Sequence, residues 1–134
     1  MEKNKIENVD TETKKYYFTK KNNIDYDKLQ ITTEGKYSIS DNIGSSKLVE
    51  LIIKYFKRTD LIITDATGNN GSDTIALSLK FKKINSIELD EINYNSLKNN
   101  INVYNLQNVE LYHDNSINLL NKLHQDIIYI DAQI

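Results

Sequence analysis

Four short apolar runs, rich in β-branched residues and bounded by turn residues, constrain the fold more than any other feature of this sequence. They span residues 61–64, 84–89, 109–113 and 127–131. Such runs are typical of strands buried on both faces of a parallel sheet, and each gap between them is long enough for a crossover helix. The sequence therefore predicts an α/β fold with a four-stranded parallel sheet and helices on both faces.

Apolar side chains recur at helical spacing in two segments. In residues 45–57 they are Leu48, Leu51, Ile52, Tyr55 and Phe56, behind Ser45 and Ser46, either of which is a suitable cap. After Asp90, a suitable cap for the second helix, they are Tyr94, Leu97, Ile101 and Tyr104. Residues 1 to about 30 show no sustained periodicity, which predicts a loose or extended polar arm over residues 1–33 and a folded domain over residues 34–134.

Composition narrows the class of protein. Hydrophobic residues make up 39% of the chain, the net charge is -2, cysteine is absent, and no apolar run approaches the roughly 20 residues that a membrane span needs. Met1 to Asp10 lack the apolar core of a secretory signal, so we expect an intracellular protein, cytoplasmic or nuclear, without disulfides or a metal site. The basic stretch Lys14 to Lys21 is expected to be a solvated face of the arm.

The segment Asp65 to Thr74 predicts a strand end, a tight loop and a helix start near Ser72. Gly68 and Gly71 suit a loop that turns sharply and lets a ligand approach free backbone N–H groups. A plain structural turn is the alternative, because such glycine pairs are common. The acid at the strand end is suited to a ligand's ammonium group, whereas it would repel a phosphate.

Two further acids follow strands two and three. Glu88 lies 23 positions after Asp65 (88 − 65), close to the roughly 20-residue offset at which an acid binds ribose hydroxyls in dinucleotide folds. The alternative is a surface acid at the start of the next helix, a role already open to Asp90. Asp114, after strand three, is placed to accept a hydrogen bond from an adenine amino group.

Acids at the ends of three successive strands make the chain resemble the Rossmann-like class I S-adenosylmethionine-dependent methyltransferases. Three motifs sharpen the resemblance toward the trimethylguanosine synthases, which hypermethylate RNA caps. Residues 34–40, Glu-Gly-Lys-Tyr-Ser-Ile-Ser, are similar to that family's Glu-Gly-Trp-Phe-Ser-Val-Thr, and residues 65–74 to its Asp-Ala-x-x-Gly-x-Gly-Gly-Asn-Thr loop. Residues 99–104, Asn-Asn-Ile-Asn-Val-Tyr, are similar to its Asn-Asn-x-x-Val-Tyr helix.

The resemblance covers residues 34 to about 131 and implies a cofactor, a substrate and a set of contacts. The cofactor would be S-adenosylmethionine and the substrate the N2 amine of guanosine in capped RNA. The implied cofactor-binding residues are Ser38, Ser40, Asp65, Thr67, Gly68, Gly71, Thr74, Glu88 and Asp114. Ser38 and Ser40 would lie near the methionine end, in what would be the N-terminal part of a methyltransferase domain.

The sequence departs from the family at two places. Asn69 stands where the family has its first glycine, and residues 131–134, Asp-Ala-Gln-Ile, stand where it has Ser/Asp-Pro-Pro-Trp. Proline rigidity and aromatic stacking on the guanine are absent there, which leaves Asp131 as the catalytic candidate and makes catalysis by this chain alone doubtful. The chain looks truncated at this point.

Two other readings stay open at this point. The first is a non-catalytic S-adenosylmethionine-binding or truncated remnant, in which a C-terminal portion or a partner chain would cover the edge of strand four. The second is nicotinamide binding, which ranks last because neither the spacing Gly-x-Gly-x-x-Gly nor its third glycine follows the first strand.

Overall fold

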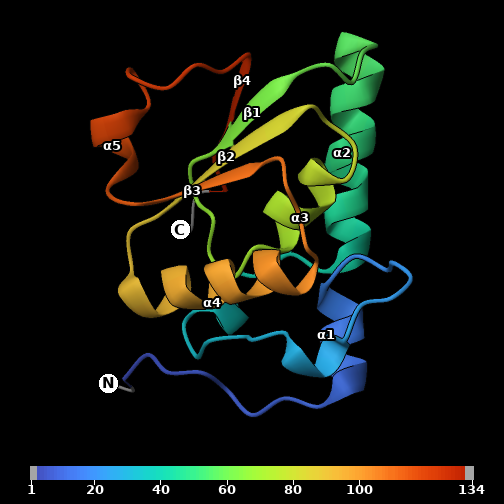
Figure 1. The fold of residues 1–134 in the computed structure, drawn as a ribbon, viewed down its shortest axis with the longest axis vertical. Helices are drawn as coiled ribbons and strands as arrows, with labels where there is room; N and C mark the ends of the chain where they lie inside the picture. The colour runs from blue at the N-terminus through green and yellow to red at the C-terminus, as the bar shows by residue number, and fades with distance from the viewer. Residues whose placement is uncertain (1–2, 132–134) are drawn as a thin grey trace.

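A computed structural model describes residues 3–131 and contains one four-stranded sheet (Figure 1). Its strands are β1 (Ile62–Asp65), β2 (Lys83–Glu88), β3 (Val109–His113) and β4 (Ile127–Tyr129). All described pairs are parallel, and the order across the sheet is β3-β2-β1-β4. The predicted parallel α/β architecture is confirmed, with strand ends that lie within two residues of the sequence prediction. All strands therefore end at the same edge of the sheet.

Helices lie on both faces of this sheet, as predicted. The helices α2 (Asn42–Phe56), α3 (Ser72–Ser78) and α4 (Glu91–Val103) cover one face, whereas α5 (Ser116–Leu119) lies on the other (Figure 1). On the α5 side, residues 124 and 125 approach the sheet, where Thr64 donates a hydrogen bond to Gln125 and Asn85 donates one to the carbonyl of His124. β4 forms an edge of the described sheet, with Ile128 and Ile130 exposed. Its cover by a C-terminal portion or a partner chain stays a prediction.

The helix starts follow from acidic caps. Asp90 caps α4 by accepting a hydrogen bond from the backbone N–H of Asn93, as predicted. The predicted serine caps of α2 are wrong, because Asp41 caps that helix through the N–H of Gly44 and the helix begins one turn earlier. Ser45 is instead buried in the first turn, where its hydroxyl has another partner.

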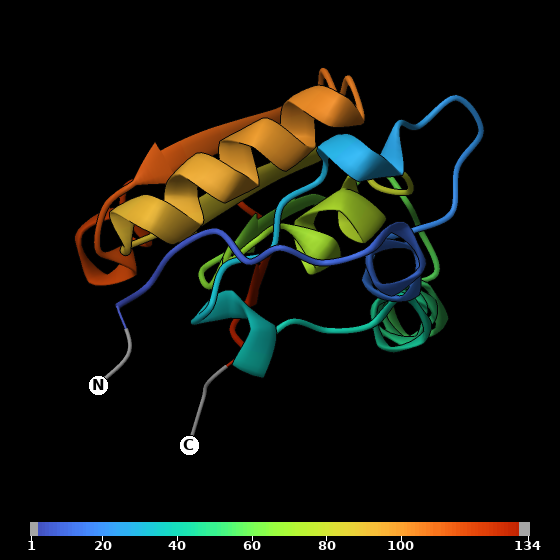
Figure 2. The ribbon, with the colours of Figure 1, turned by 90° about the horizontal axis from the view of Figure 1, so that it is seen from below.

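The N-terminal segment is packed, so its interpretation as a loose or extended arm is wrong for the described residues. It contains α1 (Thr11–Tyr17) and the two short 3-10 helices η1 (Tyr26–Lys28) and η2 (Gly35–Tyr37). Figure 2 looks along α1 and α2, which lie side by side, and shows the segment running beneath α4. Whether residue 33 marks a domain boundary stays a prediction.

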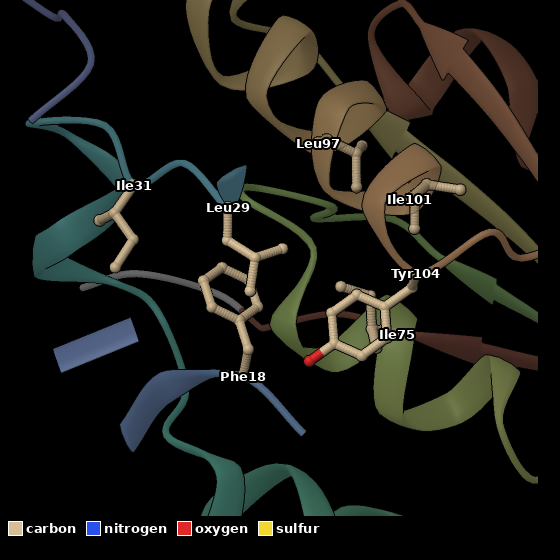
Figure 3. Close-up of a cluster of buried hydrophobic side chains, with 7 residues drawn as sticks. All are labelled: Phe18, Leu29, Ile31, Ile75, Leu97, Ile101 and Tyr104. Atoms are coloured by element: carbon tan, nitrogen blue, oxygen red, sulfur yellow. The ribbon is translucent and has the colours of Figure 1, made fainter. Parts of the chain in front are cut away.

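Two apolar clusters hold these elements together. One lies between the sheet and the α2–α3 layer and includes Ile52, Ile63, Leu77 and Ile84. The other joins the N-terminal segment to α3 and α4 (Figure 3), and its members are Phe18, Leu29, Ile31, Ile75, Leu97, Ile101 and Tyr104. The second cluster fixes the N-terminal segment against the helices that follow β1 and β2, and it thereby brings residues 34–40 close to the strand ends.

Candidate functional site

The loop after β1 turns through two left-handed residues. Asn69 has φ 52° and Gly71 has φ 95°, a region that asparagine and glycine tolerate best. The loop is also tied to the rest of the chain by Asn70, which is fully buried. Its side-chain oxygen accepts a hydrogen bond from the N–H of Thr32 at 3.1 Å, and its carbonyl accepts one from the amide of Asn100 at 2.7 Å. Asn69 therefore supplies one of the left-handed residues of this turn without a glycine.

Gly68 is required for a different reason, which is close packing against β2. Its N–H donates to the carbonyl of Ile87 at 2.8 Å, and a Cβ at this position would lie 2.6 Å from Ser86 Oγ and 2.9 Å from Leu97 Cδ2. The predicted contact between Gly68 and a cofactor stays a prediction. The packing contact is made on the side of the loop that faces β2 and α4.

We expect Gly68→Ala to lower the free energy of unfolding by about 1 to 3 kcal/mol, because the added methyl group overpacks a tight contact. Urea unfolding monitored by circular dichroism measures this change. Gly44→Ala is the matched control, since a Cβ there meets Asp41 Oδ1 at an ordinary 3.4 Å inside α2. It should be neutral or slightly stabilising. Equal effects of the two substitutions would contradict the packing role.

Asp65 lies at the end of β1 with its side chain fully buried. One carboxylate oxygen accepts from the N–H of Thr67 at 3.0 Å, and the other accepts from the hydroxyl of Thr74 at 2.7 Å, which in turn lies 2.7 Å from Ser86 Oγ. Burial raises the pKa of Asp65 to about 7, and the nearby carboxylate of Asp73 adds to this shift. Asp65 therefore stabilises the loop after β1 through these buried hydrogen bonds.

Glu88 lies at the end of β2, and both of its carboxylate oxygens bind backbone N–H groups. Oε1 accepts from Asn69 at 2.8 Å and Oε2 accepts from Asp90 at 2.9 Å. Asp90 caps α4, as predicted, and Glu88 instead holds the loop after β1 and the residue before α4. These two bonds orient the carboxylate, and each oxygen keeps a lone pair for a further donor.

A pocket of about 260 Å³ opens at the carboxyl edge of the sheet, beside Glu88. It is lined by Glu34, Ser38, Ala66, Thr67, Asn69, Glu88, Leu89, Asn93 and Asp131. One wall is the η2 segment and the other consists of strand ends. Of the predicted site residues, the pocket brings together Ser38, Thr67, Glu88 and Asp131.

The remaining predicted residues lie elsewhere. Gly71 and Thr74 are buried at the start of α3, and Ser40 donates its hydroxyl to Asp73 at 3.0 Å. Asp114 follows β3 beside Glu88, whose carbonyl accepts its N–H at 3.2 Å. The hydrogen bond from Asn118 holds the pKa of Asp114 below its usual range. The backbone N–H of Asn115 and the side-chain amide of Asn118 both donate to Oδ1 of Asp114, which leaves Oδ2 as an acceptor.

Asp73 is a central residue that sequence reasoning missed. It is buried in the first turn of α3 and accepts hydrogen bonds from three hydroxyls, those of Ser40, Ser45 and Tyr129, at 2.7 to 3.0 Å. It thus joins the segment before α2, the first turn of α2 and β4. No local signal identifies this role, because its partners are distant in sequence.

Asp131 lines the pocket at the end of the described chain. Its N–H donates to Thr67 Oγ1 at 2.9 Å, which fixes the backbone there. Burial raises the pKa of Asp131, and Asp73 raises it further. Residues 132–134 of the predicted catalytic loop lie outside the described residues.

Another cavity, of about 460 Å³, lies between α2, α3 and residues 19–20. It is larger, but it is lined by none of the strand-end acids. Ligands of parallel α/β sheets bind outside the carboxyl ends of the strands, so the smaller pocket is the candidate site. Within residues 3–131, no group of three or more potential ligands is placed to hold a metal ion, and no helix is long and apolar enough to cross a membrane.

The sequence was compared with protein families and known proteins. The model of the RNA cap guanine-N2 methyltransferase family matches residues 60–133, which is more than half of the chain and includes all four strands. This chain belongs to that family. One relative is protein L320 of Acanthamoeba polyphaga mimivirus, which is 42% identical over 74 residues. The match covers 53% of this chain and 29% of L320.

Solved structures share the fold of this methyltransferase-family chain. A predicted methyltransferase from Porphyromonas gingivalis W83 is 25% identical with a TM-score of 0.60, over 73% of this chain and 24% of that protein. An rRNA methylase from Streptococcus thermophilus is 25% identical with a TM-score of 0.52, over 64% and 49%. SMU.1697c from Streptococcus mutans, in complex with SAH, is 24% identical with a TM-score of 0.52, over 61% and 49%. The chain thus spans less than half of each of these proteins.

Proposed function

We propose that this chain forms the cofactor-binding part of an S-adenosylmethionine-dependent methyltransferase that acts on N2 of guanosine in an RNA cap, as trimethylguanosine synthases do. The family match supports the reaction class. The observation that carries the proposal is the strand-end pocket, in which Glu88 is held by two backbone N–H groups.

The charge of the pocket suits this cofactor. Among the described residues that line it, Glu34, Glu88 and Asp131 are acids and none is basic. S-adenosylmethionine carries a sulfonium and an ammonium group, which an acidic pocket attracts. A dinucleotide carries a pyrophosphate, which the same pocket repels. The acids therefore favour S-adenosylmethionine over a nicotinamide cofactor.

The polar groups also suit the nucleoside. The carboxylate of Glu88 would accept hydrogen bonds from both ribose hydroxyls, and Leu89, which is 65% exposed beside it, would offer an apolar surface for adenine. Oδ2 of Asp114 would accept from the adenine amino group, as the sequence predicts. Ser38 faces the same pocket from the η2 wall, held by the side-chain amide of Asn69, which donates to its hydroxyl at 2.9 Å.

Bound S-adenosylmethionine supplies an electrophilic methyl group on its sulfonium. The chain's own part in transfer is to hold the acceptor amine in line and to receive its proton, and Asp131 is the residue we assign to both tasks. Its partial burial and the proximity of Asp73 make its carboxylate more basic than usual, because they raise its pKa. Thr67 fixes its backbone through the hydrogen bond to Oγ1.

We expect Glu88→Gln to weaken S-adenosylmethionine binding by about tenfold or more, because a charge-assisted acceptor of the ribose hydroxyls is lost. Isothermal calorimetry on the whole chain measures this. Glu91→Gln, three positions later in the exposed first turn of α4, is the control and should bind as the wild type does. Unchanged affinity in Glu88→Gln would refute the assignment of this pocket.

Transfer of a labelled methyl group to capped and uncapped RNA tests the substrate. We expect the wild type to transfer the methyl group to capped RNA. We expect Asp131→Asn to abolish this transfer while it keeps its affinity for the cofactor. Cofactor binding without any transfer would favour the alternative, a part that binds S-adenosylmethionine but needs further protein for catalysis. That alternative is favoured by the short share of L320 that the chain matches. No cofactor binding by the folded chain would refute both.

A further inference from the structure

Tyr37 directly precedes a residue that lines the candidate pocket. It is the last residue of η2, between Glu34 and Ser38, which both line the pocket. Its side chain is 78% exposed. An exposed aromatic ring on the turn that lines a ligand pocket offers a flat apolar surface to a ligand that binds there.

The turn that carries Tyr37 is held firmly. The N–H of Gly35 donates to Thr32 Oγ1 at 2.8 Å, and the carbonyl of Gly35 accepts from the N–H groups of Ser38 and Ile39 at 2.9 and 2.8 Å. The side-chain amide of Asn69, in the loop after β1, donates to the hydroxyl of Ser38. The backbone beneath the ring is therefore ordered before any ligand arrives, so stacking on the ring requires little further ordering of this turn.

Other exposed aromatic side chains have partners within the protein. The hydroxyl of Tyr16 donates to Asp41 at 3.0 Å, and the rings of Tyr55 and Phe56 in α2 meet edge to face with centroids 4.9 Å apart. Tyr37 takes part in no aromatic contact within residues 3–131. None of the described residues that line the pocket is aromatic, and Tyr37 and Tyr94 each adjoin a lining residue in sequence. Tyr94 is stacked on His113 with centroids 4.9 Å apart, whereas Tyr37 has no such partner in the described part of the chain.

The geometry points to Tyr37 as the stacking platform for the purine base of the nucleotide that receives the methyl group. This inference rests on the proposed function and adds a residue for the acceptor. The acidic walls of the pocket repel phosphates, so the uncharged or cationic base enters and the phosphate chain stays outside. A base on Tyr37 would lie beside the turn of Glu34 and Ser38, which lines the same pocket as Asp131.

The test measures binding of the cap dinucleotide 7-methyl-GpppG to the whole chain by calorimetry, with and without S-adenosylhomocysteine. We expect Tyr37→Ala to weaken binding of the cap dinucleotide by about 5- to 150-fold, the range that loss of one stacked base gives. Tyr37→Phe keeps the ring face and should bind within about twofold of the wild type. Affinity for S-adenosylhomocysteine should be the same in all three proteins.

Tyr55→Ala is the matched control, because Tyr55 has the same 78% exposure but lies in α2. It should leave binding of the cap dinucleotide unchanged. Unaltered cap binding in Tyr37→Ala overturns the inference, and so does an equal loss in Tyr37→Phe or in Tyr55→Ala. Absence of cap binding by the wild type also overturns it, even where S-adenosylhomocysteine binds. Failure to bind S-adenosylhomocysteine, in contrast, counts against the proposed function.

Discussion

Replacing Phe18 by alanine is expected to lower the free energy of unfolding by about 3 to 5 kcal/mol, the usual loss when a buried phenylalanine is truncated. The side chain is fully buried and contacts the cluster formed by the N-terminal segment, α3 and α4 (Figure 3). Domains of this size have total stabilities of roughly 5 to 15 kcal/mol, so the variant should be partly unfolded at physiological temperature. Urea unfolding measures the loss.

Phe56→Ala provides the comparison, because it is the same substitution at the end of α2, where the side chain is 43% exposed. It should cost about 1 kcal/mol or less. Tyr104→Phe tests the same cluster by the removal of one hydrogen bond. The hydroxyl of Tyr104 donates to the carbonyl of Thr19, the residue after Phe18. A free energy of unfolding that Phe18→Ala leaves unchanged would mean that the N-terminal segment does not pack on the fold in solution.

The sheet and its crossover helices could be predicted from the sequence because each is encoded locally. A run such as Leu61 to Thr64 is buried on both faces, and the stripe of Leu97 and Ile101 repeats at the helical period. The cap Asp90 is equally local, because its partner is three residues away. The serine caps of α2 were wrong because several polar residues precede that helix and periodicity alone does not choose among them.

The packing of the N-terminal segment and the hydrogen bonds that Asp73 accepts could not be predicted from local sequence patterns. Phe18, Leu29 and Ile31 are buried, but they come from short and irregular elements that have no period. The hydroxyl partners of Asp73 lie 28 to 56 positions away, so only the folded chain brings them together. The pocket was predictable to the extent that its residues end strands, as Glu88 does.

The second large effect is expected from pH. The pKa of Asp65 is raised from 3.8 to about 7 in the folded chain, so between these values the unfolded chain ionises while the folded chain keeps its proton. The contribution of Asp65 to the free energy of unfolding is therefore greatest below about pH 4, and it is lost as the pH rises through the folded pKa. The full loss is on the order of 4 kcal/mol.

Asp65→Asn removes this titration and keeps the hydrogen bonds. Its oxygen can accept from Thr67, and its amide can donate to Thr74, whose hydroxyl then turns to Ser86. Relative to the wild type, the variant should gain roughly 2 to 3 kcal/mol between about pH 5 and pH 8.5 in urea unfolding. The control is Asp114→Asn, whose difference from the wild type should stay constant in this window because the pKa of Asp114 is lowered.

The same measurement decides whether Asp65 contacts the cofactor. An ammonium group bound against Asp65, as the sequence predicts, would favour the ionised carboxylate, lower its pKa and shrink the pH-dependent gap between wild type and Asp65→Asn when S-adenosylmethionine is added. The fully buried side chain and its absence from the pocket wall favour a gap that persists. In that case Asp65 acts only by holding Thr67 and Thr74 in the loop, and Asp131, Glu88 and Glu34 are the acids that face the ligand.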